Sequence, residues 1–215
     1  MPDDALGERI LAAAAEQLTR YGYAKTTLDA VARAAGVAKG TLYLRWRTRE
    51  DLFVAVLRRE RAAMQAEIVA ELGTGPADLR SLLAAQVRAS CRRHLMSALM
   101  LRDAEVLGGL ARAAEERGLS NTGFVGYLMG LREQGLIDTE RSLAEQVTVV
   151  SSMFIGYFAS TPMIPPSLRA DGCAAEIVAE TIHRMLVRRE PLTPAEEAAL
   201  DAATRAYATS KEDRP

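Results

Sequence analysis

The sequence contains little cysteine, histidine or aromatic residue, and it has no long hydrophobic run. Its 215 residues include 2 Cys and 2 His, too few for a disulfide scaffold or a four-ligand structural zinc site. The most apolar stretch, residues 147–158, is interrupted by two serines and is too short to cross a bilayer. The acidic residues 1–7 lack the basic and apolar regions of a signal peptide. We therefore expect a cytoplasmic protein that has no membrane partner and needs no metal or cofactor.

Apolar residues make up 49% of the chain and recur with helical spacing, which excludes disorder for most of it. No window shows sustained period-two alternation, so we predict an all-α protein. Glycine and proline divide the pattern into segments. Beyond the N-terminal region, helices are expected at residues 49–72, 77–96, 98–107, 110–134, 140–160, 174–189 and 194–208. The polar residues 209–215 are expected to form a disordered tail.

Positive charge is concentrated between Arg20 and Arg49. This segment holds seven basic residues and a single acidic one, Asp29, for a local charge of +6, whereas the whole chain has a formal charge of -1. A basic block in an otherwise acidic protein is typical of a surface that binds phosphates. A charge run by itself is more often a solvated helix face, so the function depends on which structure displays this block.

The basic block contains a pattern typical of two short helices joined by a tight turn. Thr26 or Thr27 can cap a first helix that carries an apolar stripe. Gly36 follows where the chain must turn through a left-handed conformation. A second helix is expected at about residues 38–46. The span 27–46 is thus predicted to be a helix-turn-helix, in which the second helix lies in the major groove of DNA.

The outward side chains of the second predicted helix suit a nucleic-acid surface. Small and basic residues at its start can approach base edges, and a tyrosine and an arginine further along can donate to the DNA backbone. Leu42 is expected to face the core of the small domain, with Trp46 one turn later. Thr48 and Asp51 have the spacing of a capping box for the next helix, whose first-turn Arg49 we assign to a phosphate. The predicted DNA-binding residues are Thr26, Thr27, Lys39, Gly40, Thr41, Tyr43, Arg45, Trp46 and Arg49.

Residues 8–57 resemble the N-terminal domain of the tetracycline-repressor (TetR) family of bacterial transcriptional regulators. The motifs that carry the resemblance, in the family's order and spacing, are Tyr21-Gly22-Tyr23, Thr26-Thr27, Ala35-Gly36-Val37, Gly40-Thr41-Leu42-Tyr43 and Arg49-Glu50-Asp51-Leu52. After Tyr43 the family often has a second aromatic residue and a histidine, whereas this chain has Leu44 and Arg45. The operator sequence therefore does not follow from the resemblance.

The resemblance implies a three-helix DNA-binding domain at residues 1–50 and a larger helical domain for effector binding and dimerisation at residues 51–208. It implies a homodimer that binds a palindrome-like double-stranded DNA operator with half-sites about one helical turn apart. It also implies a repressor that a small, largely apolar effector releases from DNA, because the effector favours a conformation with wrongly spaced reading helices. The protein would then be a regulator and not an enzyme.

Residue type and helical position suggest effector and dimer residues within the second domain. Methionine and aromatic side chains suit a plastic apolar cavity, although most such residues simply fill cores. The predicted effector pocket consists of Met64, Met96, Met100, Phe124, Tyr127, Met153 and Tyr157. The predicted dimer interface, a four-helix bundle of the kind that the family uses, includes Phe154, Ile177, Thr181, Ile182 and Met185. The alternative is that one of these faces belongs to the monomer core.

Two other functions remain open from the residues alone. An enzyme would use Cys91 or His94, which stand at i and i+3 of a predicted helix, but no third ligand or orienting acid accompanies them. A helical interaction protein would use the basic block to bind an acidic protein or a membrane surface. The position of the block within a two-helix turn motif favours DNA over both.

Overall fold

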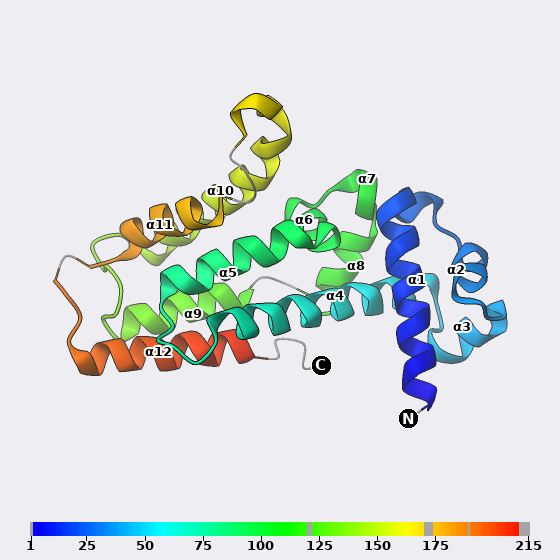
Figure 1. Cartoon of the computed structure of the whole chain (residues 1–215), viewed down its shortest axis with the longest axis horizontal. Helices are drawn as coiled ribbons and strands as arrows, with labels where there is room; N and C mark the ends of the chain where they lie inside the picture. Colours follow the sequence, from blue (N-terminus) through cyan, green and yellow to red (C-terminus); the bar gives the residue numbers. More distant parts are fainter. Residues whose placement is uncertain (1, 120–121, 170–173, 189, 211–215) are drawn as a thin grey trace. The chain divides into compact units, whose positions relative to one another are not determined.

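The computed structural model describes residues 2–119, 122–169, 174–188 and 190–210 (Figure 1). Over these residues the regular structure is helical and no strand is present, which confirms the all-α prediction. The helices are α1 (Pro2–Lys25), α2 (Leu28–Ala35), α3 (Lys39–Arg45), α4 (Arg49–Leu72), α5 (Leu79–Arg92), α6 (His94–Leu101), α7 (Ala104–Leu107), α8 (Leu110–Glu116), α9 (Thr122–Glu133), α10 (Leu143–Ser160), α11 (Ala175–Leu186) and α12 (Pro194–Thr209). Two 3₁₀ turns, η1 (Thr161–Met163) and η2 (Pro166–Leu168), follow α10. Within the described ranges, none of these helices has the length and apolar character of a membrane span.

The chain forms two compact units. Among the described residues, the N-terminal unit comprises residues 2–63 and 93–119, and the C-terminal unit comprises residues 64–92 and those described between 122 and 210. Helix α4 begins in the first unit and ends in the second. The DNA-binding domain predicted at residues 1–50 is a part of the N-terminal unit, because α1 packs against α6 and α7 as well as against α2.

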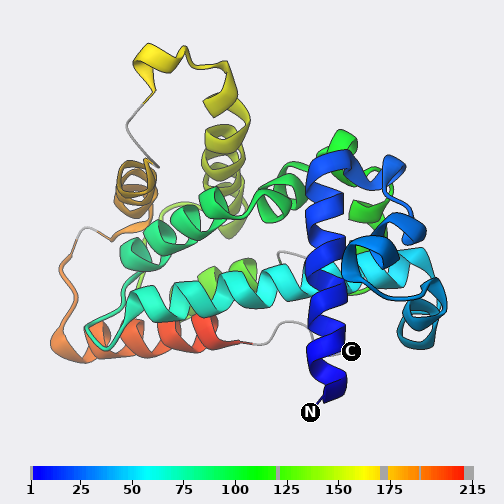
Figure 2. The ribbon, with the colours of Figure 1, turned by 45° about the vertical axis from the view of Figure 1, so that its right-hand side comes forward.

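An apolar core holds the N-terminal unit together. Ile10, Ala14 and Leu18, which follow one another at intervals of four residues along α1, are fully buried. Figure 2 shows α1 running beside α2 and α3. At its end, Tyr23 packs edge-on against Phe53 of α4, with ring centroids 5.4 Å apart. Burying a large apolar side chain contributes about 1.5–3 kcal/mol, so this core fixes the helices that carry the predicted DNA surface.

Two predicted helices are interrupted where the sequence analysis expected continuity. The prediction of one helix over 98–107 is wrong, because Arg102 adopts a left-handed conformation with φ 50° and ends α6. The carboxylate of Asp103 then accepts the backbone N–H groups of residues 105 and 106 and starts α7. The prediction over 110–134 is also wrong, because Gly118 has a φ of 86° and separates α8 from α9.

A third interruption removes the proposed thiol–imidazole pair. Helix α5 ends at Arg92 and α6 begins at His94, with Arg93 between them at φ -120° and ψ 90°. Cys91 and His94 therefore lie in different helices, and the prediction of a single helix over 77–96 is wrong. The helical i, i+3 spacing that suggested a catalytic pair does not exist.

The C-terminal unit is a bundle in which α5 packs against α11 and α9 packs against α12. Its fully buried apolar side chains include Leu82, Leu83, Val87, Leu128, Leu131, Ile182 and Leu186. The helices predicted over 140–160, 174–189 and 194–208 correspond to α10, α11 and α12. Helix α12 continues through Thr209, where the disordered tail was predicted to begin, and residues 211–215 lie outside the described residues.

Candidate nucleic-acid interface

The connection between α1 and α2 separates the roles of two neighbouring threonines. Thr26 is 2% exposed, and its hydroxyl lies 2.8 Å from the carbonyl oxygen of Gly22 and 3.0 Å from that of Gln17. Thr26 therefore ties down the end of α1, and its hydroxyl points into the domain and not to the surface where a DNA contact was predicted. The hydroxyl of Thr27 accepts the backbone N–H of Ala30 at 3.2 Å and is the N-cap of α2.

The turn between α2 and α3 has the geometry that the sequence predicted. Gly36 ends α2 in the left-handed region, with φ 65° and ψ 38°. Its N–H donates to the carbonyl of Arg33 at 3.1 Å, and the N–H of Val37 donates to that of Ala32 at 2.9 Å. This pair of bonds is a Schellman motif, which satisfies the last carbonyls of the helix. The turn therefore sets the angle at which α3 leaves α2.

Helix α3 has a buried side and an outward side. Leu42 is 1% exposed and anchors the helix to the core, as predicted. Lys39, Gly40 and the ring of Tyr43 are exposed, and Thr41 is half-buried. Trp46 is half-buried and lies just past the helix, in extended backbone with φ -127°.

Lys39 is held by the only acidic residue of the basic block. Its Nζ lies 2.8 Å from Oδ2 of Asp29 in the first turn of α2, and both side chains are exposed. The hydrogen bond that the ammonium group donates to this carboxylate raises the pKa of Lys39, so the side chain stays charged. Exposed ion pairs are weak because water and salt screen them. A DNA phosphate or base edge can therefore replace Asp29 as the partner of Lys39.

Arg49 has internal partners instead of the phosphate that the sequence suggested. Its Nε donates to the carbonyl of Thr26 at 3.1 Å, and its Nη2 donates to the carbonyl of Tyr23. The guanidinium carbon lies 3.8 Å from the ring centre of Tyr23. Burial raises the pKa of the Tyr23 hydroxyl, and the nearby Arg49 charge opposes that rise. Arg49 thus joins the end of α1 to the start of α4.

The remaining basic residue of the predicted set lies at the edge of α3. Arg45 is half-buried, and a Cβ added to Gly7 of α1 would lie 2.9 Å from its Nη1. Arg45 therefore extends along α1. The capping box predicted for α4 is confirmed, since Thr48 and Asp51 exchange hydrogen bonds of 3.0 and 3.1 Å.

The predicted effector residues are divided between the two units. Met96 and Met100 belong to the N-terminal unit, whereas the other five belong to the C-terminal unit. Within the latter, Phe124 and Tyr127 cluster with a residue that the sequence analysis missed, Tyr207 of α12. The rings of Tyr127 and Tyr207 stack with centroids 4.9 Å apart. The sequence signal that could have found Tyr207 was its i, i+3 spacing from Thr204 on the predicted 194–208 helix, which places both residues on one helix face.

The Tyr127 cluster has one polar point. The hydroxyl of Tyr127 lies 2.8 Å from that of Thr204, which is fully buried. Burial raises the pKa of Tyr127 well above its usual value, so the phenol is neutral. Tyr157 lies in different surroundings, because its hydroxyl accepts the N–H of Ala174 at 3.1 Å and lies 3.8 Å from the sulfur of Cys91. Met64 and Met153 are half-buried.

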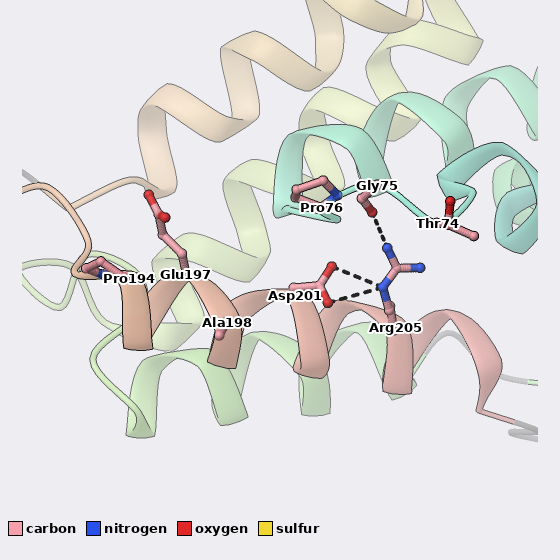
Figure 3. Close-up of a pocket in the computed structure, with 8 residues that line it drawn as sticks. All are labelled: Thr74, Gly75, Pro76, Pro194, Glu197, Ala198, Asp201 and Arg205. Atoms are coloured by element: carbon pink, nitrogen blue, oxygen red, sulfur yellow. Dashed lines mark hydrogen bonds and ion pairs between the residues drawn. The ribbon is translucent and has the colours of Figure 1, made fainter.

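A surface pocket of about 400 Å³ lies between the α4–α5 loop and α12 (Figure 3). Its lining residues are Thr74, Gly75, Pro76, Pro194, Glu197, Ala198, Asp201 and Arg205, none of which was a predicted effector residue. Arg205 donates to Asp201 at 3.0 Å and to the loop carbonyls of Gly73 and Gly75. Asp201 also accepts the N–H of Ala77 at 2.6 Å. These bonds fasten the loop to α12, which is a structural role.

The predicted dimer residues divide between core and surface. Ile182 is fully buried and Phe154 is nearly so, which places both in the monomer core and corrects their assignment. Ile177 is 66% exposed, Thr181 is exposed and Met185 is half-buried. Further exposed apolar side chains on α10 and the segment after it are Val149, Ile155, Met163, Ile164 and Leu168.

The described part of the chain is helical, and its α2–α3 pair has the geometry of a helix-turn-helix. Residues 10–56 match the family model described as bacterial regulatory proteins, tetR family. Over 44 residues the chain is 48% identical to the uncharacterized HTH-type transcriptional regulator YhgD of Bacillus subtilis (strain 168), and over 62 residues it is 39% identical to the uncharacterized HTH-type transcriptional regulator Mb2274c of Mycobacterium bovis. These alignments span 20% and 29% of this chain and 23% and 33% of those relatives. The N-terminal region of the chain is therefore similar to that of the tetR family, and the sequence match spans about a quarter to a third of the curated relatives' length.

The fold extends the similarity beyond the matched sequence. The multidrug-efflux repressor NalD of Pseudomonas aeruginosa is 23% identical and superposes with a TM-score of 0.58, over 87% of this chain and 98% of that one. FadR of Bacillus subtilis, solved with stearoyl-CoA, is 18% identical with a TM-score of 0.61, over 86% and 99%. A TetR family transcription regulator from Marinobacter aquaeolei VT8 is 18% identical with a TM-score of 0.56, over 87% and 98%. At these identities the similarity is one of fold.

Proposed function

We propose that this protein is a DNA-binding transcriptional regulator that places α3 of each subunit of a homodimer in the major groove of a palindromic operator. The observation that carries the proposal is the arrangement of α3. Leu42 is buried against the core, the Gly36 turn fixes the helix, and the outward side chains lie within a block of charge +6. A short helix held in this way, with basic and small outward residues, matches the chemistry of groove recognition.

The DNA-contact residues follow from exposure. Lys39 exchanges Asp29 for a phosphate or a guanine edge, and the exposed hydroxyl of Tyr43 donates to a phosphate. Gly40 and Thr41 allow close approach to the bases, while Thr27, Arg45 and Trp46 border the same helix pair. Thr26 and Arg49 leave the proposed set, because their polar groups bind inside the domain.

Dimerisation is proposed through the exposed face of α10 and α11. Contiguous apolar side chains in water are typical of protein interfaces. A two-fold dimer repeats the same patch on both subunits, and it presents two α3 helices to half-sites about one DNA turn apart. Changing the exposed Ile177 to Asp should yield a folded monomer in sedimentation velocity, and a dimer of unchanged affinity would exclude this face.

The effector is proposed to be a small, largely apolar molecule that binds in the C-terminal unit and releases the protein from DNA. The aromatic cluster of Phe124, Tyr127 and Tyr207 supports this assignment, because it combines a large apolar surface with one buried hydroxyl pair. Release requires that the effector bind more tightly to the conformation that does not fit the operator.

The test of DNA binding uses duplexes selected by the full-length protein from a randomised library. Lys39→Ala and Tyr43→Phe should each weaken binding by about 1–3 kcal/mol, and Lys39→Ala should flatten the salt dependence by about one phosphate contact per subunit. Circular dichroism and gel filtration should be unchanged. The control is Arg112→Ala, which removes an exposed arginine of α8 outside the basic block. Wild-type affinity in both α3 variants would refute the proposal.

A further inference from the structure

The outward side of α3 has an apolar strip, made of Gly40 and Leu44, between two polar flanks. Successive residues of an α-helix are about 100° apart, so residues four apart share a face. Gly40 and Leu44 therefore form one strip, about 160° away from the buried Leu42. Lys39 and Tyr43 lie on one flank of this strip, and Thr41 and Arg45 lie on the other.

Leu44 supplies the side chain of this strip, since Gly40 has none. It is 88% exposed, more than any other large apolar side chain in the described part of the chain. Gly40, the other residue of the strip, is also exposed, and a Cβ added there would meet nothing within 4 Å. The strip thus consists of exposed backbone at Gly40 beside the isobutyl group of Leu44. No described part of the subunit covers it.

The residues on the two flanks indicate which binding partner the strip faces. A helix in the major groove directs its flanks to the two phosphate backbones and its outermost strip to the base edges on the groove floor. Here the flanks carry the ammonium group of Lys39 and the half-exposed Tyr43 on one side and Thr41 on the other. The strip between them carries no hydrogen-bonding side chain. It therefore suits an apolar feature of the groove floor, and the C5-methyl group of thymine is the apolar group displayed there.

We propose that Leu44 determines operator specificity by contacting the methyl group of one thymine in each half-site, with Gly40 allowing the backbone to approach closely enough. This proposal rests on the proposed DNA-binding function and adds a base preference to it. Leu44 acts through apolar contact alone, so it discriminates thymine from a base without the methyl group and contributes nothing to the salt dependence.

The experiment removes the methyl group without changing base pairing. Full-length protein first selects a site from a randomised duplex library, and each thymine of that site is then replaced by deoxyuridine. Burying one methyl-sized group changes affinity about fourfold. The affinity of the wild-type protein should fall about fourfold when deoxyuridine replaces the contacted thymine in one half-site. It should fall about fifteenfold when the contacted thymines of both half-sites are replaced. Replacing that thymine by cytosine should weaken binding, and 5-methylcytosine should restore part of it.

Variants separate this contact from general DNA binding. Leu44→Ala should bind the thymine and deoxyuridine duplexes equally, whereas Leu44→Met, which keeps an apolar side chain, should still prefer thymine. Lys39→Ala should weaken both duplexes by the same factor and keep their ratio. Val69→Ala trims an exposed apolar side chain of α4 in the C-terminal unit and should change neither value.

Two results overturn the proposal and a third identifies a deeper failure. Wild-type protein that is insensitive to deoxyuridine at every thymine has no methyl contact. Discrimination that persists in Leu44→Ala assigns the contact to another residue. If the library yields no enriched site at all, the proposed DNA-binding function fails first, and the inference falls with it.

Discussion

The guanidinium of Arg49 stacks on the ring of Tyr23, 3.8 Å from its centre, while its Nε donates to the carbonyl of Thr26 at 3.1 Å. The first residue of α4 thus holds the last turn of α1 and the residue before the cap of α2. Arg49 therefore acts together with the apolar core and the Thr26 hydroxyl to fix the helix-turn-helix against α1. A cation at a helix N-terminus is unfavourable for the helix dipole, and these contacts offset that cost.

Arg49→Ala is therefore expected to destabilise the fold more than it affects any direct DNA contact. Loss of two charge-assisted hydrogen bonds and a cation–π contact should lower the free energy of unfolding by about 2–3 kcal/mol. Urea denaturation measures this change. Arg47→Ala removes a neighbouring exposed arginine and should stay within about 0.5 kcal/mol. Equal stability of the two variants would show that the Arg49 contacts contribute nothing.

Gly36→Ala and Gly22→Ala should differ in severity although both residues have positive φ. At Gly36 an added Cβ meets nothing within 4 Å, so only the left-handed conformation is penalised, by about 1–2 kcal/mol. At Gly22, with φ 73° and ψ 165°, the Cβ would lie 2.6 Å from the carbonyl oxygen of Glu105. Backbone cannot move aside as a side-chain end can, so a loss of more than about 3 kcal/mol is expected. Thermal denaturation of both variants tests the order, and a smaller loss at Gly22 would contradict it.

Asp29→Asn should tighten DNA binding, because it frees Lys39 and removes the only negative charge of the basic block. We expect a gain of several-fold at low salt that shrinks as salt rises. The gain should disappear in the Asp29→Asn, Lys39→Ala double variant if it acts through Lys39. A small loss of stability, about 0.3–1 kcal/mol, should accompany the change, since an acid in the first turn favours α2. Fluorescence anisotropy across a salt series distinguishes this from unaltered or weakened binding.

Tyr127→Phe should leave the buried hydroxyl of Thr204 without its 2.8 Å partner. The expected cost is about 1–3 kcal/mol, because a buried polar group then loses its hydrogen bond. Thr204→Val in the same background should recover most of that loss, since both polar groups are then gone. A double-mutant cycle from chemical denaturation gives the coupling, and additive losses would show that the two hydroxyls do not interact.

The local features of this protein follow from the sequence by itself. The Gly36 turn, a threonine cap at residue 26 or 27 and the Thr48–Asp51 capping box were all predictable. Each depends on groups within one or two helical turns, so residue type and spacing suffice to determine it. The same reasoning identified the buried position of Leu42 and hence the outward side of α3.

Only the tertiary structure decided which residue of each similar pair is buried or bonded. It buried Thr26 beside the capping Thr27, and Ile182 beside the exposed Ile177. It gave Arg49 partners 23 and 26 residues away, and it joined Tyr127 to Thr204 across 77 residues. Such contacts depend on how whole helices pack, and a helix face with several apolar positions does not specify its partner. Local spacing therefore located α3, whereas packing decided which residues of the predicted DNA-binding set are exposed.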